Sequence, residues 1–464
     1  MSEIFDLILK NGHAVTPSGI LQTDIGVKDG KIAAFGDLAR GKTLIDCENL
    51  HILPGVIDTQ VHFREPGLTH KEDLATGTLS AIAGGVTTVF EMPNTDPLTI
   101  TPEALQDKMA HAQNRAFCDY AFFAGGCAEN AHILASLERM AGCCGIKVFM
   151  GSSTGSLLAA EDETLRKIMQ HGNRRIAIHA EDNPRLDARK HIAEQSHDVH
   201  DHPVWRDEET ALTAVKRAIS IARETGRRIH LLHVTSAGEM DYLRHHKDIA
   251  TIETTPQHLT LHAPDCYDKL GTFAQMNPPI RGKSHQEALW RAVADGTVDV
   301  LGSDHAPHTR EEKAKLYPAS PSGMTGVQTM LPVMLDHVHH GRLSLERLVD
   351  LLCHGPQRIY NIARKGRIAA GYDADFAIVD LRASFTITNN WIKSKCGWSP
   401  FDGTKTNGKV MGTVLRGTVV MWDDEILESR NRPPLGIPVS FTEVLNPVKA
   451  FDCESIASIQ NACC

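Results

Sequence analysis

The stretch from Asp58 to Gly67, DTQVHFREPG, follows the apolar run ILPGVI, which is typical of a buried strand. Side chains alternate along an extended strand, so Asp58, Gln60 and His62 point to the same face. Two histidines at i and i+2 would form a metal-binding pair, because both imidazoles could reach one ion. Here a glutamine, Gln60, holds the first place of that pair. The stretch is therefore compatible with three interpretations: a metal site that has lost a ligand, a metal site of a different kind, or no metal site at all.

Polar residues that can bind metal or form hydrogen bonds also lie at the ends of most other strand candidates. One strand-end histidine alone would indicate a hydrogen-bonded core residue. Several at successive strand ends, together with an aspartate, indicate a shared site, because the carboxyl ends of barrel strands meet at one face. They are Asn94 after TTVFEM, Lys147 in GIKVF, His179 in RIAIHAED, His230 and His233 in RIHLLHV, His258 in ETTPQH, Asn277 in QMNPP, and Asp304, His305 and His308 in VDVLGSDHAPH.

Histidine nitrogens and a carboxylate are suitable ligands for zinc and similar divalent ions. A catalytic site keeps one position open for water and lowers the pKa of that water toward 7. Asp304 leaves its strand directly into a polar loop, so we expect it to be both a ligand and the proton carrier. His233 stands at a strand exit and is predicted to be a ligand. His230 lies one face away and is predicted to be structural.

Lys147 needs a separate explanation, because an ammonium group beside divalent cations is repelled and does not bind them. Reaction of the amine with carbon dioxide gives a carbamate, whose negative charge and two oxygens can bridge two ions. The sequence GIKVF is also compatible with a buried strand whose lysine reaches solvent. Because the other candidate ligands also lie at strand ends, we interpret Lys147 as a carbamate ligand.

Two β-rich ends enclose a region in which strands and helices alternate. Repeated alternation over about 300 residues predicts an α/β fold with a parallel sheet, either a barrel or a doubly wound sheet. The two ends are expected to fold together into one small β-domain. The predicted boundaries are 1–52 for the first part of the β-domain, 53–365 for the α/β region, 366–440 for the second part of the β-domain, and 441–464 for a tail.

Composition argues against several classes of protein. The net charge of the 464 residues is -9 with both signs mixed, which argues against a nucleic-acid surface. No apolar run approaches the roughly 20 residues that cross a bilayer. The start of the chain lacks the features of a signal peptide, and the 11 cysteines form no CxxC pair. We therefore expect a cytoplasmic enzyme with reduced thiols, no membrane partner and no nucleic-acid partner.

These residues resemble the amidohydrolase superfamily, and within it the cyclic amidohydrolases, which include dihydroorotases, allantoinases and hydantoinases. The resemblance rests on LPGVIDTQVHFREPG, GIKVFMG, IHAED, LLHVTS, GSDHAPH and GYDADFAIVDL, in this order along almost the whole chain. It implies a (β/α)8 TIM barrel with a β-sandwich built from both chain ends. It also implies that a metal-activated water attacks a ring amide while an aspartate moves the proton. The implied metal ligands are His62, Lys147 as a carbamate, His179, His233 and Asp304.

Among these enzymes the chain is most similar to dihydroorotases, which interconvert dihydroorotate and N-carbamoyl-aspartate in pyrimidine biosynthesis. Arg64 and Asn94 match their substrate-binding arginine and asparagine, and an arginine is the natural partner of a substrate carboxylate. His308 matches a further carboxylate contact, and Asn277 matches a contact to the ring. Arg64 could instead form a surface salt bridge with Glu65 or Glu72. Family members also suggest a homodimer or a transcarbamoylase partner.

The departure at Gln60 affects the metal count. A neutral amide oxygen is a poor substitute for imidazole on zinc, so one of two ions should be weakened. We predict one tightly held ion, with Zn2+ as the expected metal and the second ion weak or absent. Three hypotheses stay open: an active dihydroorotase-like enzyme with an altered site, another cyclic amide or ureide hydrolase, and a non-catalytic structural subunit.

Overall fold

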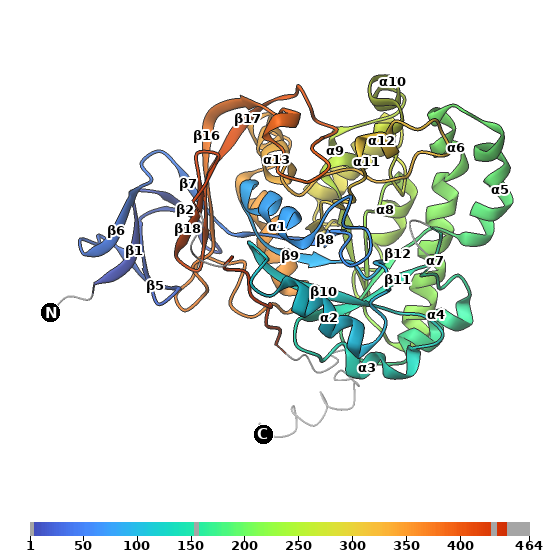
Figure 1. Ribbon diagram of the computed structural model, residues 1–464, viewed down its shortest axis with the longest axis horizontal. Helices are drawn as coiled ribbons and strands as arrows, with labels where there is room; N and C mark the ends of the chain where they lie inside the picture. The colour runs from blue at the N-terminus through green and yellow to red at the C-terminus, as the bar shows by residue number, and fades with distance from the viewer. Residues whose placement is uncertain (1–3, 153–156, 428–433, 443–464) are drawn as a thin grey trace, which may run out of the picture.

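The computed structural model describes residues 4–152, 157–427 and 434–442, and its centre is a barrel of parallel strands (Figure 1). The barrel strands are paired in chain order, with β8 and β15 at the two ends of the sheet. A backbone bridge between Val61 and His305, and a hydrogen bond of 2.7 Å from His62 N to His305 O, join these two ends. The predicted barrel is therefore confirmed. Its strands are β8 (Val56–Val61), β9 (Val86–Glu91), β10 (Asp119–Gly125), β11 (Cys143–Phe149), β12 (Ile176–His179), β13 (Ile229–Leu231), β14 (Ala250–Thr254) and β15 (Val300–Leu301).

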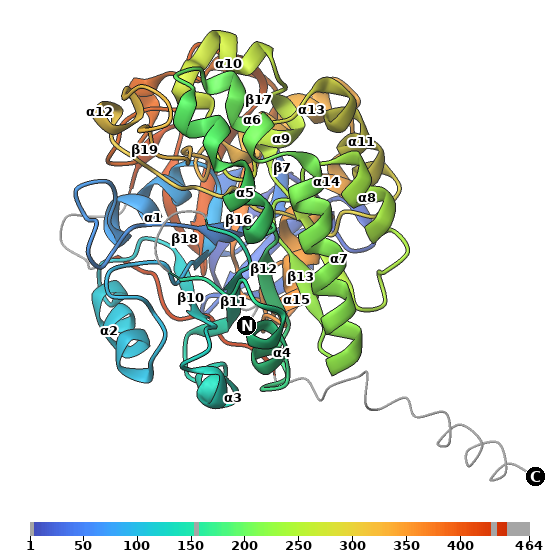
Figure 2. The same ribbon diagram turned by 90° about the vertical axis from the view of Figure 1, so that its right-hand side faces the viewer.

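Helices follow the barrel strands and cover the outside of the barrel (Figures 1 and 2). The longest, α7, starts where the Asp207 side chain accepts a hydrogen bond from Thr210 N and ends at Gly226, whose φ is 65°. Within the described residues no helix is long and apolar enough to span a membrane. The helices are α1 (Leu74–Ala83), α2 (Pro102–Ala112), α3 (Leu134–Leu137), α4 (Asp162–Met169), α5 (Asn183–Gln195), α6 (His202–Trp205), α7 (Glu208–Thr225), α8 (Ala237–Leu243), α9 (Pro256–Thr260), α10 (Asp265–Leu270), α11 (Lys283–Ala294), α12 (Arg310–Lys313), α13 (Met330–His339), α14 (Leu345–Val349) and α15 (Gly355–Tyr360), with short η turns at Ala131–Ile133, Val199–Asp201, Gly271–Ala274, Asp350–His354 and Asn389–Trp391.

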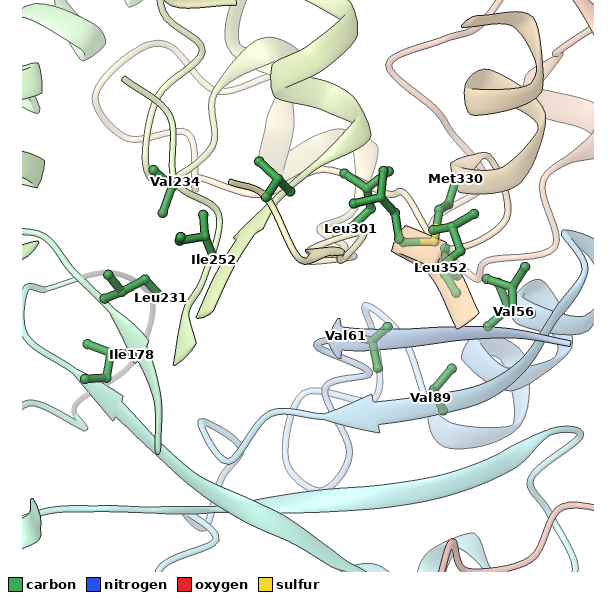
Figure 3. Close-up of a cluster of buried hydrophobic side chains, with 14 of the residues drawn as sticks. Val56, Val61, Val89, Ile178, Leu231, Val234, Ile252, Leu301, Met330 and Leu352 are labelled. Carbon is green, nitrogen blue, oxygen red and sulfur yellow. The ribbon is translucent and has the colours of Figure 1, made fainter. Parts of the chain in front are cut away.

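Side chains on the barrel strands alternate between the helices and the barrel interior. Ile178, Leu231 and Ile252 lie on three neighbouring strands and belong to the large apolar cluster that also includes helix residues (Figure 3). Burial of each such side chain stabilises the fold by about 1.5–3 kcal/mol. The next residues along β12 and β14, His179 and Glu253, must then face inward. Burial of the aliphatic face thus directs the polar residues into the barrel.

The interior of the barrel is filled by aromatic side chains. Phe90, Phe123 and Tyr360 pack edge to face, with ring centroids 5.2 Å apart for Phe90 and Tyr360 and 5.9 Å apart for Phe123 and Tyr360. Tyr360 arrives from α15, outside the barrel strands. This packed interior supports the polar residues at the strand ends.

The two chain ends together form a β-sandwich, as predicted. One sheet has the order β5-β4-β1-β6, and the other has the order β19-β18-β17-β16-β7-β2-β3. Leu7, Ile25, Phe376 and Val414 lie in the apolar core that the sheets share. The strands are β1 (Phe5–Lys10), β2 (His13–Thr16), β3 (Gly19–Gln22), β4 (Asp24–Lys28), β5 (Lys31–Gly36), β6 (Gly41–Asp46), β7 (His51–Pro54), β16 (Phe376–Thr386), β17 (Lys405–Leu415), β18 (Thr418–Trp422) and β19 (Glu425–Ile426).

The residue numbers of the predicted domain boundaries remain predictions. Of the predicted tail, only Phe441 and Thr442 lie within the described residues.

Candidate active site

A cavity of about 320 Å³, partly open to solvent, lies at the carboxyl ends of the barrel strands. It collects strand-end residues that are far apart in the sequence. Its lining consists of Gln60, His62, Lys147, Phe149, His179, His233, Asn277, Asp304, Ala306, Ser322 and Gly323. Arg64, Asn94 and His308 are not part of this lining, but they contact one another or a lining residue. The structure therefore brings the residues predicted from the sequence into one region.

The first group in the cavity consists of His179, His233 and Lys147, from three neighbouring strands. His179 Nδ1 and His233 Nε2 are 3.0 Å apart, and burial lowers the pKa of both imidazoles. Lys147 is fully buried, and its Nζ has no hydrogen-bond partner among the described residues. Burial lowers the pKa of this amine to about 7. An unpaired buried amine is costly, so Lys147 is expected to have a further partner or a modification.

Glu181 orients His179 from behind. Its Oε2 lies 2.9 Å from His179 Nε2, so the imidazole donates through Nε2 and presents Nδ1 to the cavity. Arg206 Nε donates a hydrogen bond to Glu181 Oε1 at 3.1 Å. Burial would raise the pKa of the Glu181 carboxyl, but the charge of Arg206 outweighs this effect and holds the pKa well below its usual range. Carboxylates behind histidine ligands are a regular feature of metal sites. The sequence signal for Glu181 is its position two residues after His179, which the sequence analysis did not use.

The second group consists of His62, Asp304 and Gln60. His62 Nδ1 donates a hydrogen bond of 2.8 Å to Asn94 Oδ1, so the neutral imidazole carries its proton on Nδ1 and Nε2 is left as an acceptor. This acceptor nitrogen lies 3.2 Å from Asp304 Oδ1, another acceptor. Two acceptors in contact require a proton or a cation between them. The pair is therefore suited to a shared metal ion.

Gln60 faces the cavity, as strand alternation predicts. Its Nε2 donates a hydrogen bond of 2.9 Å to Asp304 Oδ1, while its Oε1 is buried without a partner among the described residues. The amide nitrogen cannot bind a metal, because it carries hydrogens and has no free lone pair. As arranged, Gln60 is bonded to Asp304 through its amide nitrogen.

Three residues of the site have a left-handed backbone, which is uncommon for residues other than glycine. Their φ values are 64° for Arg64, 37° for His233 and 45° for Asp304. Each such conformation costs about 1–3 kcal/mol and persists only where the surrounding structure imposes it. This concentration of strain at the strand exits is typical of a functional site.

Arg64 and His308 lie together beside the cavity, and Arg64 carries the charge, because burial and the neighbouring Arg64 lower the pKa of His308 well below its usual value. Arg64 is only 3% exposed; its Nε donates to Pro307 O at 3.1 Å, and its Nη2 lies 3.2 Å from His308 Nε2. Glu65 instead pairs with Arg115, and Glu72 lies near His305. Neither of the salt bridges considered from the sequence is therefore formed. Burial lowers the pKa of Arg64 to about 10, which still leaves it charged and without a carboxylate partner among the described residues.

The prediction that Asn277 ends a strand is wrong. The described segment around Asn277 is a loop between the η turn Gly271–Ala274 and α11. Asn277 still lines the cavity, and its Oδ1 accepts a hydrogen bond of 3.0 Å from His202 Nε2. The two prolines that follow it disfavour regular structure, and the apolar residues before it imitated a strand.

Glu253 on β14 is a buried carboxyl below the cavity that the sequence analysis missed. Its Oε2 accepts a hydrogen bond of 2.7 Å from Thr59, and its Oε1 has no partner among the described residues. Burial raises the pKa of Glu253 to about 8 and that of Asp58 on β8 to about 7. The signal was available in ATIET, where Glu253 alternates with the outward-facing Ile252. These groups form a polar layer between the cavity and the aromatic interior.

The donor set fits divalent metal in two unequal parts. Within the part of the chain that the structure describes, no three His, Cys, Asp or Glu side chains are grouped closely enough to hold an ion. His62 with Asp304 could supply two ligands, and His179 with His233 could supply two more. Lys147 adds a third ligand to the second pair only if it carries a carbamate. Gln60 adds no ligand to the first pair.

Comparisons with known proteins agree on one family. The model of the amidohydrolase family matches residues 51–420. A dihydroorotase of Halobacterium salinarum is 37% identical over 92% of this chain and 98% of its own length. An allantoinase of Deinococcus radiodurans is 35% identical over 90% of this chain and 96% of its own. The solved structure of an L-hydantoinase from Arthrobacter aurescens has a TM-score of 0.88 and 31% identity, covering 94% of this chain and all of that one.

Proposed function

This chain belongs to the amidohydrolase family, a family of hydrolases, and we propose that it is a dihydroorotase. The proposed reaction is the reversible hydrolysis of the ring amide of dihydroorotate to N-carbamoyl-aspartate. Relatives with this name and relatives named allantoinase or hydantoinase are similar to the chain to comparable degrees. The choice among substrates therefore depends on the site.

The observation that carries the choice is that the buried Arg64 forms no salt bridge with a carboxylate among the described residues, although Asp304 and Glu91 act on it at longer range. A buried guanidinium without a carboxylate partner is costly, and an anionic group on the substrate would offset that cost. Dihydroorotate and N-carbamoyl-aspartate carry such a carboxylate, whereas the hydantoin and allantoin rings carry none. Arg64 would bind this carboxylate as a fork, with His308 beside it.

The proposed metal position uses Lys147 as a carbamate, His179 and His233. A divalent ion held there would activate water and polarise the ring carbonyl. Because Gln60 offers an amide N–H to Asp304, the pair His62 and Asp304 is proposed to hold a second ion weakly or not at all. We therefore propose one tightly bound ion per chain, with zinc as the expected metal.

Asp304 is the proposed proton carrier. Its Oδ1 is engaged by Gln60 and lies near His62, so proton transfer is assigned to Oδ2. The carboxylate would take a proton from the attacking water and give it to the ring nitrogen that leaves. Asn277 lines the same cavity and is proposed to contact the ring.

Purified protein tests this proposal through turnover of dihydroorotate, allantoin and hydantoin, together with the metal content of the chain. We expect about one tightly bound ion, turnover of dihydroorotate and loss of that turnover in Asp304→Ala. Turnover of allantoin or hydantoin in preference to dihydroorotate would replace the proposed substrate. Absence of both metal and turnover would favour a non-catalytic subunit.

A further inference from the structure

A second cavity, here called the lower arginine pocket, lies at the amino-terminal ends of the barrel strands. Arg175 immediately precedes β12, and Arg228 immediately precedes β13. Since the strands are parallel, this end of the barrel is opposite the strand ends that form the candidate active site. The pocket is partly open to solvent, and its lining consists of Asn173, Arg174, Arg175, Arg228, Arg358, Ile359, Tyr360, Asn361 and Thr442.

The lining of the pocket has four arginines and, among the described residues, no acidic side chain. Arg175 and Arg228 are held side by side: Arg175 Nη1 donates to Ile229 O at 3.0 Å, and Ile176 N donates to Arg228 O at 3.2 Å. Each hydrogen bond crosses between the two neighbouring strands. The backbone pairing of β12 and β13 therefore fixes two like charges next to each other.

Little of this charge is neutralised by the protein. Arg358 is paired, because its Nη1 lies 2.7 Å from Asp350 Oδ1. Arg174 donates to a backbone carbonyl, that of Cys143, which carries no net charge. Burial lowers the pKa of Arg175 to about 10, and repulsion from Arg228 is the next cause, with Asp299 opposing it.

Three polar atoms of the lining are buried without a partner among the described residues. They are Nε of Arg175, Nε of Arg228 and the hydroxyl oxygen of Tyr360. An unsatisfied buried donor usually costs about 1–3 kcal/mol. Three of them around one cavity that also concentrates positive charge are unlike ordinary core packing, where buried polar groups are satisfied.

We propose that the lower arginine pocket binds a phosphate group, either inorganic phosphate or that of a small phosphate monoester. A phosphate offers several acceptor oxygens around one centre, so the guanidinium groups of Arg175 and Arg228, at the starts of neighbouring strands, can bond to it together. Asn173, Asn361 and Thr442 supply neutral polar contacts for the rest of an ester. This site is separate from the catalytic cavity and does not depend on the proposed substrate.

The test is titration of the full chain with inorganic phosphate and with glycerol 3-phosphate, by calorimetry in a buffer free of phosphate and sulfate. We expect saturable binding of one phosphate group per chain, weakened by added salt. Arg175→Gln and Arg228→Gln should each weaken it at least about tenfold, since each removes a charged donor. Arg382→Gln is the matched control, because that arginine is exposed on β16, away from the pocket. Comparison of the two titrants distinguishes free phosphate from an ester.

Arg64→Gln separates this site from the catalytic one, because binding at the lower pocket should survive that change. Thermal melting gives a second readout, because the proposal predicts the direction in which the melting temperature changes. Without phosphate, Arg228→Gln should melt at a higher temperature than the unchanged chain, because it relieves repulsion with Arg175. With phosphate, the unchanged chain and the Arg64→Gln variant should both gain stability, and Arg228→Gln should gain less. Absence of saturable binding, or binding that Arg64→Gln removes and Arg228→Gln leaves intact, would overturn the proposal.

Discussion

Replacement of Arg64 by glutamine is the sharpest test of substrate choice. The guanidinium is buried, it has no carboxylate partner among the described residues, and it lies 3.2 Å from His308 Nε2 through its Nη2. Glutamine removes the charge. Its amide can still donate to Pro307 O, which accepts from Arg64 Nε in the unchanged chain. The change therefore removes the proposed anion partner with little loss of local packing.

The size of the effect follows from the interactions that are lost. A hydrogen bond between charged partners contributes about 1.5–3 kcal/mol, and a fork makes two that are only partly additive. A loss of about 3 kcal/mol corresponds to a roughly 100-fold decrease in kcat/KM for dihydroorotate. Most of it should appear in KM, because the carboxylate is remote from the bond that breaks. The free energy of unfolding should fall by no more than about 1 kcal/mol and can rise, since a buried charge without a salt bridge disappears.

Steady-state kinetics and chemical denaturation of the same preparation measure both quantities. Arg115→Gln is the control, because Arg115 is a partly exposed arginine that already pairs with Glu65 at 2.7 Å. It should leave kcat/KM within about twofold of the unchanged chain, because Arg115 does not line the cavity and Glu65 keeps its hydrogen bond from Leu74 N. A loss below about fivefold in Arg64→Gln would refute the assigned role. So would an equal loss on hydantoin, which has no carboxylate to bind.

Three further changes test the metal site and its support. Gln60→His should raise the metal content from about one ion per chain toward two, because it places an imidazole beside His62. Mass spectrometry measures this content, and an unchanged count would contradict the inferred weak site. Lys147→Met should lose metal and turnover while the melting temperature holds or rises, and 13C-labelled bicarbonate should give a carbamate resonance only in the chain with Lys147. A labelled signal that persists in the variant would count against the carbamate. Arg206→Met should lower the free energy of unfolding by about 3–5 kcal/mol, because it leaves the buried Glu181 carboxylate without its cation; a second change, Glu181→Gln, should recover part of this loss in urea denaturation.

The residues on the strands were accessible from the sequence because side-chain direction there obeys a simple period. Lys147 and His179 face the cavity because their neighbours along each strand are aliphatic and belong to the apolar cluster that includes helix residues. The barrel and the two-ended β-sandwich could be predicted for the same reason, since alternation and turn residues are local signals.

Contacts that depend on loops and side-chain conformations were not accessible in this way. Asn94 bonds to His62, where the resemblance predicts a contact to substrate, and the distance of 2.8 Å depends on how two loops pack. Arg206 reaches Glu181 from a position 25 residues along the chain. No periodic signal marks such a pairing, because the intervening α5 and α6 determine it.

The closure of the barrel between β8 and β15 also has a consequence for the order of assembly. His62 and Asp304 are separated by almost the whole barrel in sequence, and they meet only when the first and last strands join. His179 ends β12 and His233 follows the adjacent β13, beside Lys147 on β11. Contacts between sequence neighbours form at a lower entropic cost than distant ones. If the proposed roles hold, the half of the site with Lys147 forms during synthesis before the half with Asp304 exists, and the proposed proton carrier arrives last, so an incomplete chain would hold metal without being able to hydrolyse the substrate.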